Sequence, residues 1–174
     1  NLMMINGYIC RHSKEEEIAR DFISFEENDL VILVCDAVCL ERNLNLVLQV
    51  LEITNKVIVC VNLMDEAGKK KIHIDIKALE EYLEVPVGGI SAKSSKGISC
   101  LLKQINAFAS NQILQDGIYL KYPTLIEKAV NELEKLFPET IDAHFTRWLS
   151  LKLLDDDFDF IQKIIKQYHI SEND

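Results

Sequence analysis

The chain lacks several features that would each point to a particular class of protein. No apolar run reaches the roughly 18–20 residues of a membrane-spanning helix, and the first residues show no secretory signal. The five cysteines are scattered, odd in number and without a C-x-x-C pair, so neither a disulfide framework nor a zinc site is predicted. A reducing cytosol fits this cysteine pattern best.

Charge and composition narrow the function further. The 174 residues are 48% hydrophobic and 27% charged, which favours a folded core over disorder. The net charge of −9 argues against a nucleic-acid partner and against docking on anionic lipid by charge alone. The length suits one domain, or one domain with a small appendage.

Short apolar runs alternate with segments of helical periodicity up to about residue 111. Strands are predicted at residues 30–35 and 56–61, from Pro86 onward and over residues 3–5. Helices are predicted over 13–26, from Leu40, from Asp75 and from Gly97, and a charged loop over 66–74. This alternation predicts an α/β fold, with a parallel sheet and crossover helices.

The pattern changes near residue 112, after which no strand is predicted. Helical stripes cover 125–136, with Pro138 ending the first helix, then 145–154 and 158–168. Trp148 is expected in the core of this part or at a contact between the two domains. The predicted domains are therefore residues 1–111, α/β, and 112–174, all helical.

Two polar side chains follow the strand at 56–61. Asn62 and Asp65 are three residues apart on one short loop, and ligands of open parallel sheets bind at the carboxyl ends of strands. A carboxylate can accept two hydrogen bonds from the N1 and N2 edge of guanine, an edge that adenine lacks. The Asn could brace the neighbouring loop and offer its amide to N7. Taken alone, this pair fits a capped turn better than a guanine site.

A second stretch strengthens the guanine interpretation. The strand that begins at Pro86 ends in Ser91, Ala92 and Lys93, and a backbone N–H near Ala92 could donate to guanine O6. With this second loop and a family resemblance together, guanine binding becomes the favoured interpretation. For Asp36, at the end of the strand 30–35, a strand-end cap and a ligand role stay equally open. For Glu41-Arg42-Asn43, a network capping the helix start is favoured.

The chain resembles the cytosolic G-protein region of FeoB-type ferrous iron transporters. The resemblance covers most of residues 13–155 and rests on the segments Glu16–Phe22, Asp29–Ala37, Leu40–Leu44, Asn62–Ala67, Ile74-Asp75, Val85–Val87, Ser91–Lys93 and Arg147–Leu154. It implies a Ras-like GTPase domain followed by a helical domain, on the cytoplasmic side of a membrane permease in the same longer protein.

The resemblance also assigns roles. Asn62 and Asp65 would be the guanine-specificity pair, and Ser91, Ala92 and Lys93 the loop that supports the base. Leu63 stands where the family pattern usually has Lys. The alkyl stem of that Lys packs on the face of the base, and a Leu can provide part of the same apolar contact. The implied ligands are GTP and GDP, with Mg²⁺ in the complete protein, and the implied function is regulation of Fe(II) uptake.

One motif of this family is missing from the sequence. GTP hydrolysis needs G-x-x-x-x-G-K-[ST], and none of the six glycines precedes Lys-Ser or Lys-Thr. Gly7 could end the D-x-x-G switch motif, but Met4 stands where its Asp belongs. We therefore expect a fragment or a degenerate front end, and no GTP hydrolysis by this chain alone.

Two alternatives stay open, a nucleotide-free pseudo-GTPase interaction module and a small GTPase of another kind. The helical segment around Trp148 argues against the second. If the first strand and helix of a Ras-like sheet are missing, apolar faces of the strands at 30–35 and 56–61 would be exposed. We expect a non-standard sheet order there, with residues 1–12 folding back, or a homo-oligomer.

No metal site is predicted. The acidic run Asp155–Asp159 resembles a calcium loop, but Phe160 and Lys166 replace the Gly and Glu that such a loop needs. The four histidines are too dispersed to share a metal ion. The lysine run 69–71 is expected to be a solvated loop.

Overall fold

The computed structural model describes residues 2–6, 14–26, 28–110, 121–138, 141–155, 160, 162–164 and 166. The chain divides into two compact units, residues 1–118 and 119–174. The predicted boundary between 111 and 112 lies outside the described residues and stays a prediction.

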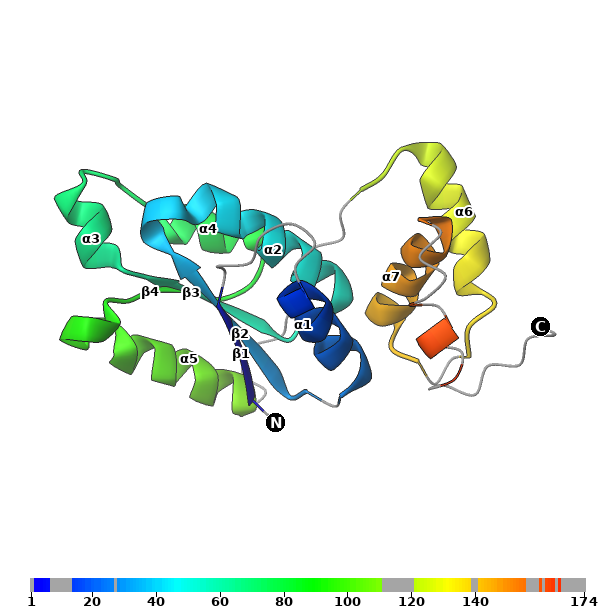
Figure 1. Ribbon diagram of the computed structural model, residues 1–174, viewed down its shortest axis with the longest axis horizontal. Helices are drawn as coiled ribbons and strands as arrows, with labels where there is room; N and C mark the ends of the chain where they lie inside the picture. Colours follow the sequence, from blue (N-terminus) through cyan, green and yellow to red (C-terminus); the bar gives the residue numbers. More distant parts are fainter. Residues whose placement is uncertain are drawn as a thin grey trace. The chain divides into compact units, whose positions relative to one another are not determined.

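Unit 1 is built on a four-stranded parallel sheet (Figure 1). The strands are β1 (Leu2–Asn6), β2 (Leu30–Asp36), β3 (Val57–Asn62) and β4 (Val87–Gly89), and their order in the sheet is β1-β2-β3-β4. The N-terminal strand pairs with β2, Leu2 opposite Leu30, so the chain's own start covers the edge that we expected to need cover. Oligomer formation stays a prediction.

Three of the described helices lie over one face of the sheet. Helix α2 (Leu40–Ile53) contacts β2 and β3, α1 (Lys14–Phe25) contacts α2, and α4 (Ile76–Leu83) contacts β4. Val47, Val50 and Leu51 of α2 are each at most 3% exposed. Since β2 and β3 are apolar up to their last residues, Asp36 and Asn62, both of their faces need such cover.

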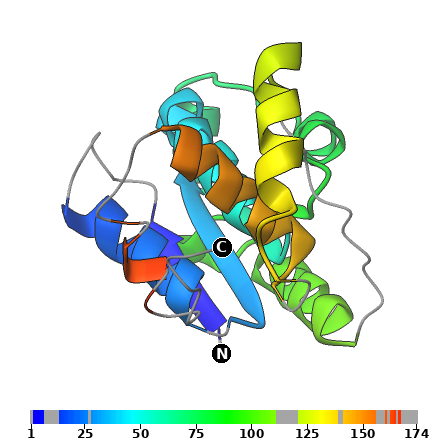
Figure 2. The same ribbon diagram turned by 90° about the vertical axis from the view of Figure 1, so that its right-hand side faces the viewer.

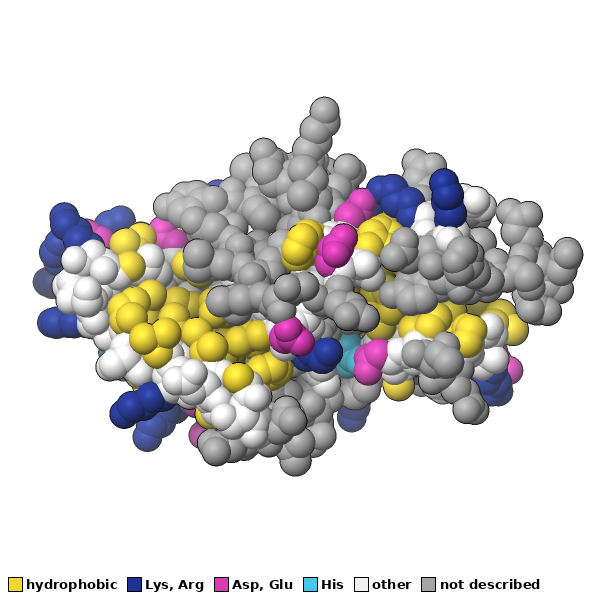
Figure 3. Space-filling view, turned by 90° about the horizontal axis from the view of Figure 1, so that it is seen from below, with side chains coloured by type: hydrophobic (Ala, Val, Ile, Leu, Met, Phe, Trp, Pro, Cys, Tyr) yellow, Lys and Arg dark blue, Asp and Glu magenta, His cyan; other side chains and the backbone are white. Residues whose placement is uncertain are grey.

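The other face is covered by α5 (Ile98–Ala109), which lies across the sheet from α2 in Figure 1. Its apolar side packs on a buried cluster in the strands, formed by Leu30, Ile32, Ile58, Cys60 and Ile90. None of the residues of α5 is fully buried, and Leu102 is 54% exposed. Figure 3, seen from the α5 side, shows hydrophobic side chains gathered on this face.

One sequence prediction about unit 1 is wrong. Residues 66–74 were expected to be a loop, but a short helix, α3, runs from Met64 to Lys69. Ala67 anchors it, being 1% exposed, while Lys69, Lys70 and Lys71 are exposed as expected. The predicted cap of α4 is confirmed, because Asp75 Oδ1 accepts a hydrogen bond from Ala78 N at 3.0 Å.

Unit 2 contains α6 (Thr124–Glu134) and α7 (Ala143–Leu154), which pack side by side (Figure 2). Helix α6 ends before Pro138, not at it. Trp148 is 3% exposed, stacks on Phe145 with ring centroids 5.5 Å apart, and meets Phe160 edge-on at 5.1 Å. Its predicted place in the core of the helical part is confirmed.

An ion pair fastens the two helices of unit 2. The guanidinium of Arg147 donates to both carboxylate oxygens of Glu127, at 2.8 and 3.0 Å, and Glu127 also accepts from Tyr122 N at 2.8 Å. These contacts, Arg147 first, lower the pKa of Glu127. The predicted helix 158–168 falls mostly outside the described residues, of which 160, 162–164 and 166 are helical. Among the helices described in either unit, none is long and apolar enough to cross a membrane.

Candidate functional site

The candidate site lies where β3 and β4 end. Asn62 is the last residue of β3, and Leu63, which caps α3, turns the chain with a left-handed backbone (φ 63°). Such a conformation costs a non-glycine residue on the order of 1 kcal/mol and persists where the surroundings hold it. The turn places Asp65 in the first turn of α3, close to the loop that follows β4.

Three hydrogen bonds join the two loops. Ala92 N donates to Asn62 Oδ1 at 3.1 Å, Asp65 N donates to Ser91 Oγ at 3.0 Å, and Met64 N donates to Ile90 O at 3.1 Å. Two of these bonds link residues that the sequence had singled out, across 30 and 26 positions. The structure thus brings Asn62, Asp65, Ser91 and Ala92 together, and Asn62 braces the neighbouring loop.

Asp65 provides an ionised acceptor at this place. Its pKa is lowered, chiefly by the Ser91 hydroxyl and then by the backbone N–H groups of Asp65 and Glu66, with a further contribution from Lys69. One of its oxygens, Oδ1, is buried and accepts no hydrogen bond from a described residue. An ionised carboxylate has about four acceptor positions, so this side chain keeps capacity for a ligand's donors.

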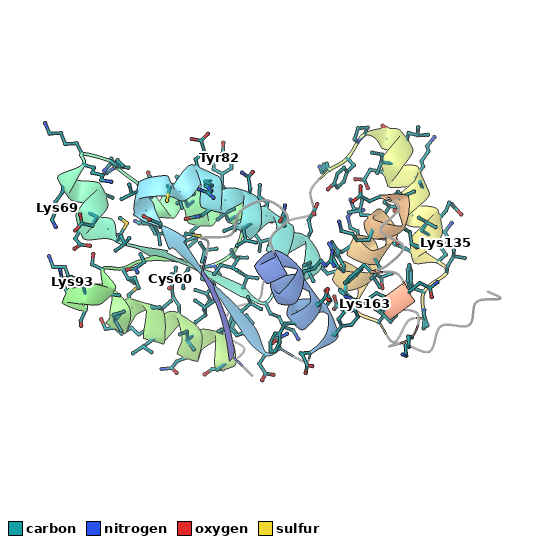
Figure 4. The ribbon with its side chains drawn as sticks, viewed as in Figure 1. Cys60, Lys69, Tyr82, Lys93, Lys135 and Lys163 are labelled. Carbon is teal, nitrogen blue, oxygen red and sulfur yellow. The ribbon has the colours of Figure 1, made fainter. Side chains whose placement is uncertain are left out.

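The other predicted residues lie in the same loop but differ in how exposed they are. Ser91 is 3% exposed and is fixed by its contact to Asp65, whereas Ala92 and Lys93 are exposed on the short 3-10 helix η2 (Ala92–Ser94). Figure 4 shows Lys93 and Lys69 at the same end of unit 1. The N–H of Ala92 is bound to Asn62 here, so a guanine O6 would have to share or replace that bond. Binding of guanine by these residues stays a prediction.

Asp36 ends the neighbouring strand β2 and has a different environment. It lies opposite Asn62 in the sheet register. Its Oδ1 accepts from Val38 N at 2.7 Å, capping the 3-10 helix η1 (Ala37–Cys39), and its N–H donates to Asn43 Oδ1 at 2.7 Å. The cap interpretation of Asp36 is therefore confirmed. The Asn43 side chain instead braces the end of β2, and the N-cap residue of α2, Cys39, makes no side-chain cap bond.

The sequence did not reveal two features of the site. The backbone of Ile90 joins both loops, since Ile90 N donates to Val61 O at 2.8 Å and Ile90 O accepts from Met64. The left-handed turn at Leu63 has no sequence signal either, because Leu is not a residue that favours it. Among the described residues, no group of three or more His, Cys, Asp or Glu side chains could hold a metal ion.

The parallel sheet, the paired loops at its carboxyl edge and the helical unit that follows define a G-protein domain with an appended helical domain. The comparisons with known proteins are specific. Residues 8–105 match the family model for ferrous iron transport protein B, and residues 122–173 match that for the FeoB cytosolic helical domain. The chain belongs to the FeoB family.

Relatives and solved structures agree with this assignment. The chain is 37% identical over 145 residues to the Fe(2+) transporter FeoB of Escherichia coli K12, and 32% identical to that of Salmonella typhimurium LT2. The apo cytosolic domain of T. maritima FeoB aligns with a TM-score of 0.76 and 32% identity, over 89% of this chain and 61% of that one. That of L. pneumophila FeoB aligns at 0.75 and 28%, over 92% and 63%.

The two kinds of relative differ in length from this chain. The matched region is 83% of this chain but 18% of each of the two curated transporters. The T. maritima cytosolic domain has also been solved in GDP and GMPPNP forms, with TM-scores of 0.76 and 0.77 to this chain for one GDP form and the GMPPNP form.

Proposed function

We propose that this chain carries the guanine-recognising part of the cytosolic G-protein region of a ferrous iron transporter. In the complete protein, GTP binding and hydrolysis at this region, with Mg²⁺, would regulate Fe(II) uptake by a membrane domain of the same polypeptide. The observation that carries the proposal is the pair of cross-loop contacts, Asn62 to Ala92 and Ser91 to Asp65, around an ionised carboxylate.

The chemistry of the base selects guanine. Guanine presents two adjacent N–H donors to the Asp65 carboxylate, whereas adenine has an acceptor at N1, which would face that carboxylate and repel it. A site that leaves a buried polar group unpaired discriminates strongly against the wrong ligand. The nucleotide in the T. maritima GDP and GMPPNP forms supports the same ligand class for this chain.

The phosphate side limits what this chain does by itself. The sequence has no G-x-x-x-x-G-K-[ST], so the backbone cradle, the lysine and the Mg²⁺-binding hydroxyl of that motif do not contribute. Charge-assisted phosphate contacts are the strong ones, so we expect affinity well below that of a complete G-protein domain, and no hydrolysis.

The test is a titration of the chain with GDP and with ADP. Calorimetry and amide NMR measure the binding, and NMR also detects binding in the millimolar range. Guanine-selective shifts at Asp65 and Ala92 would support the proposal. The absence of any selective response at millimolar GDP would contradict it and would favour the second candidate, a nucleotide-free interaction module. The exposed apolar side chains on the α5 side favour that second candidate.

A further inference from the structure

The loop between β4 and α5 closes on itself. Ser91 N donates to Lys96 O at 3.0 Å, and the two residues form an isolated antiparallel bridge. Between them lie η2 and Ser95, whose backbone is left-handed (φ 58°). Ser91 and Ala92, which meet Asp65 and Asn62, are thus held at the start of a tight six-residue loop.

Gly97 follows this loop and lies against the backbone of β4. Its φ is +80°, a region that L side chains rarely adopt, and a Cβ added there would be 2.3 Å from Gly89 O and 3.1 Å from the Cα of Ile90. Both neighbours are backbone atoms, so they cannot move aside as a flexible side chain would. Only a glycine allows the chain to approach β4 this closely.

The backbone that Gly97 touches is the junction of the site. Ile90 N is bonded to β3 through Val61 O, and Ile90 O is bonded to the start of α3 through Met64 N. The carbonyl of Gly97 also accepts from Cys100 N and Leu101 N, at 3.0 and 3.1 Å, which starts α5. Gly97 therefore fixes both ends of the loop, β4 at one side and α5 at the other.

We propose that Gly97 is a positioning residue for base recognition, because its close contact with Gly89 and Ile90 sets where Ser91 and Ala92 meet the Asp65 loop. The claim about base recognition rests on the proposed function, whereas the claim about loop position does not. Any side chain at position 97 would push the loop away from β4 and lengthen the contacts of Ser91 and Ala92 with their partners.

The chain offers a matched control. Gly68, in α3 of the same unit, has nothing within 4 Å of an added Cβ and no positive φ. Gly97→Ala and Gly68→Ala make the same chemical change, and only the first meets backbone. We expect Gly97→Ala to lower the hydrogen-exchange protection of the Ser91 and Asp65 amides about tenfold or more, which corresponds to the loss of roughly one hydrogen bond. Gly68→Ala should leave this protection unchanged.

Core amides provide the internal reference. Val31 N donates to Lys56 O and Val59 N to Pro86 O, away from the loop, and their protection should stay within about twofold in a folded Gly97→Ala variant. Selective loss at Ser91 and Asp65 would support the proposal. Equal protection in wild type and Gly97→Ala would overturn it.

A second variant covers the case in which Gly97→Ala does not fold. One glycine inserted between Lys96 and Gly97 adds no Cβ but separates the loop closure from the contact with β4, at a place where residues 92–96 are exposed. Loss of Ser91 protection in this variant would support the proposal, and unchanged protection would overturn it.

Base preference is the readout that a purely structural glycine would not change selectively. In Gly97→Ala, the preference for GDP over 6-thio-GDP, in which sulfur replaces O6 while N1–H and the 2-amino group stay, should fall. The preference for GDP over IDP, which lacks the 2-amino group expected to donate to Asp65, should fall less, because Asp65 stays in the first turn of α3 and is disturbed only through its contact with Ser91. A fall in both preferences alike would overturn the assignment to the Ala92 loop. If wild type shows no guanine preference at all, the proposed function fails, and the exchange data alone decide the loop claim.

Discussion

Strands β2 and β3 are neighbours in the sheet, and each ends in a polar turn that contains an aspartate. The two aspartates differ in their hydrogen-bond partners. Asp36, after β2, accepts from Val38 two residues away and is braced by Asn43 of the following helix. Asp65, after β3, has its N–H bonded to Ser91, 26 residues away, and its buried Oδ1 accepts nothing from the described residues.

The difference separates a side chain that caps its own turn from one that we propose binds a ligand. A carboxylate that closes its own turn uses its acceptors locally, as a helix cap does. A carboxylate that is held by a distant loop and keeps one buried oxygen without a partner among the described residues needs an explanation beyond local capping, and the proposed ligand provides one. The same residue type at the same sheet edge can therefore be assigned to stability or to binding by tracing its hydrogen bonds.

The largest effect is expected from Asp65→Asn. An Asn side chain offers one acceptor and one donor, which match the N1–H and O2 of xanthine in place of the two donors of guanine. We expect the ratio of XDP to GDP affinity to rise on the order of a hundredfold, since two charge-assisted hydrogen bonds change partner. Amide NMR titration with XDP and GDP measures this ratio.

Two controls define that experiment. Glu66→Gln removes the adjacent carboxylate, which pairs with Lys69 at the surface (2.7 Å), and should leave the ratio unchanged. Asp36→Asn should also leave it unchanged. An Asp36→Asn variant that switched its preference toward xanthine would reverse the comparison between the two aspartates.

A smaller effect, on stability, is expected from Asn43→Ala. Asn43 is 3% exposed and accepts from Asp36 N, so its loss removes a buried acceptor and should lower the free energy of unfolding by about 1–3 kcal/mol. Asn45→Ala, on the exposed side of the same helix, should cost less than about 0.5 kcal/mol. Urea denaturation measures both. Equal midpoints for the two variants would show that the Asn43 contact does not hold the β2 turn.

Much of this architecture could be predicted from local sequence. Continuous apolar runs predicted the strands β2 and β3, and helical periodicity predicted α1, α2, α5 and α7, because each pattern reports burial of one face or of both. The prediction of a loop at 66–74 was wrong because the helix there is too short for a burial pattern to show. A six-residue helix is too short to show a period, and Gly68 with three lysines looks like a loop.

The site was predicted in kind but not in geometry. Asn62, Asp65 and Ser91 were identified because polar residues follow buried strands, yet no local pattern gives the bonds that join positions 26 or 30 residues apart. The fit of Gly97 against Gly89 is likewise tertiary, and the sequence marked Gly97 only as the start of a helix. Neither hydrophobic periodicity nor charge pattern predicts a close contact between two backbone segments.

The smallest expected effect concerns pH and the carboxylate of Asp65. Its pKa in the folded chain is lowered from the ordinary value of 3.8, first by the Ser91 hydroxyl, so the ionised form is the one that the fold favours. A lowered folded pKa adds stability that is fully present above about pH 4 and is lost as the pH falls through the folded value. The stability advantage of wild type over Asp65→Asn should therefore shrink as the pH falls from about 4 through the folded pKa. Urea midpoints of the two proteins at several pH values in that range would show it, and midpoints that move in parallel would mean that Ser91 does not favour the ionised carboxylate.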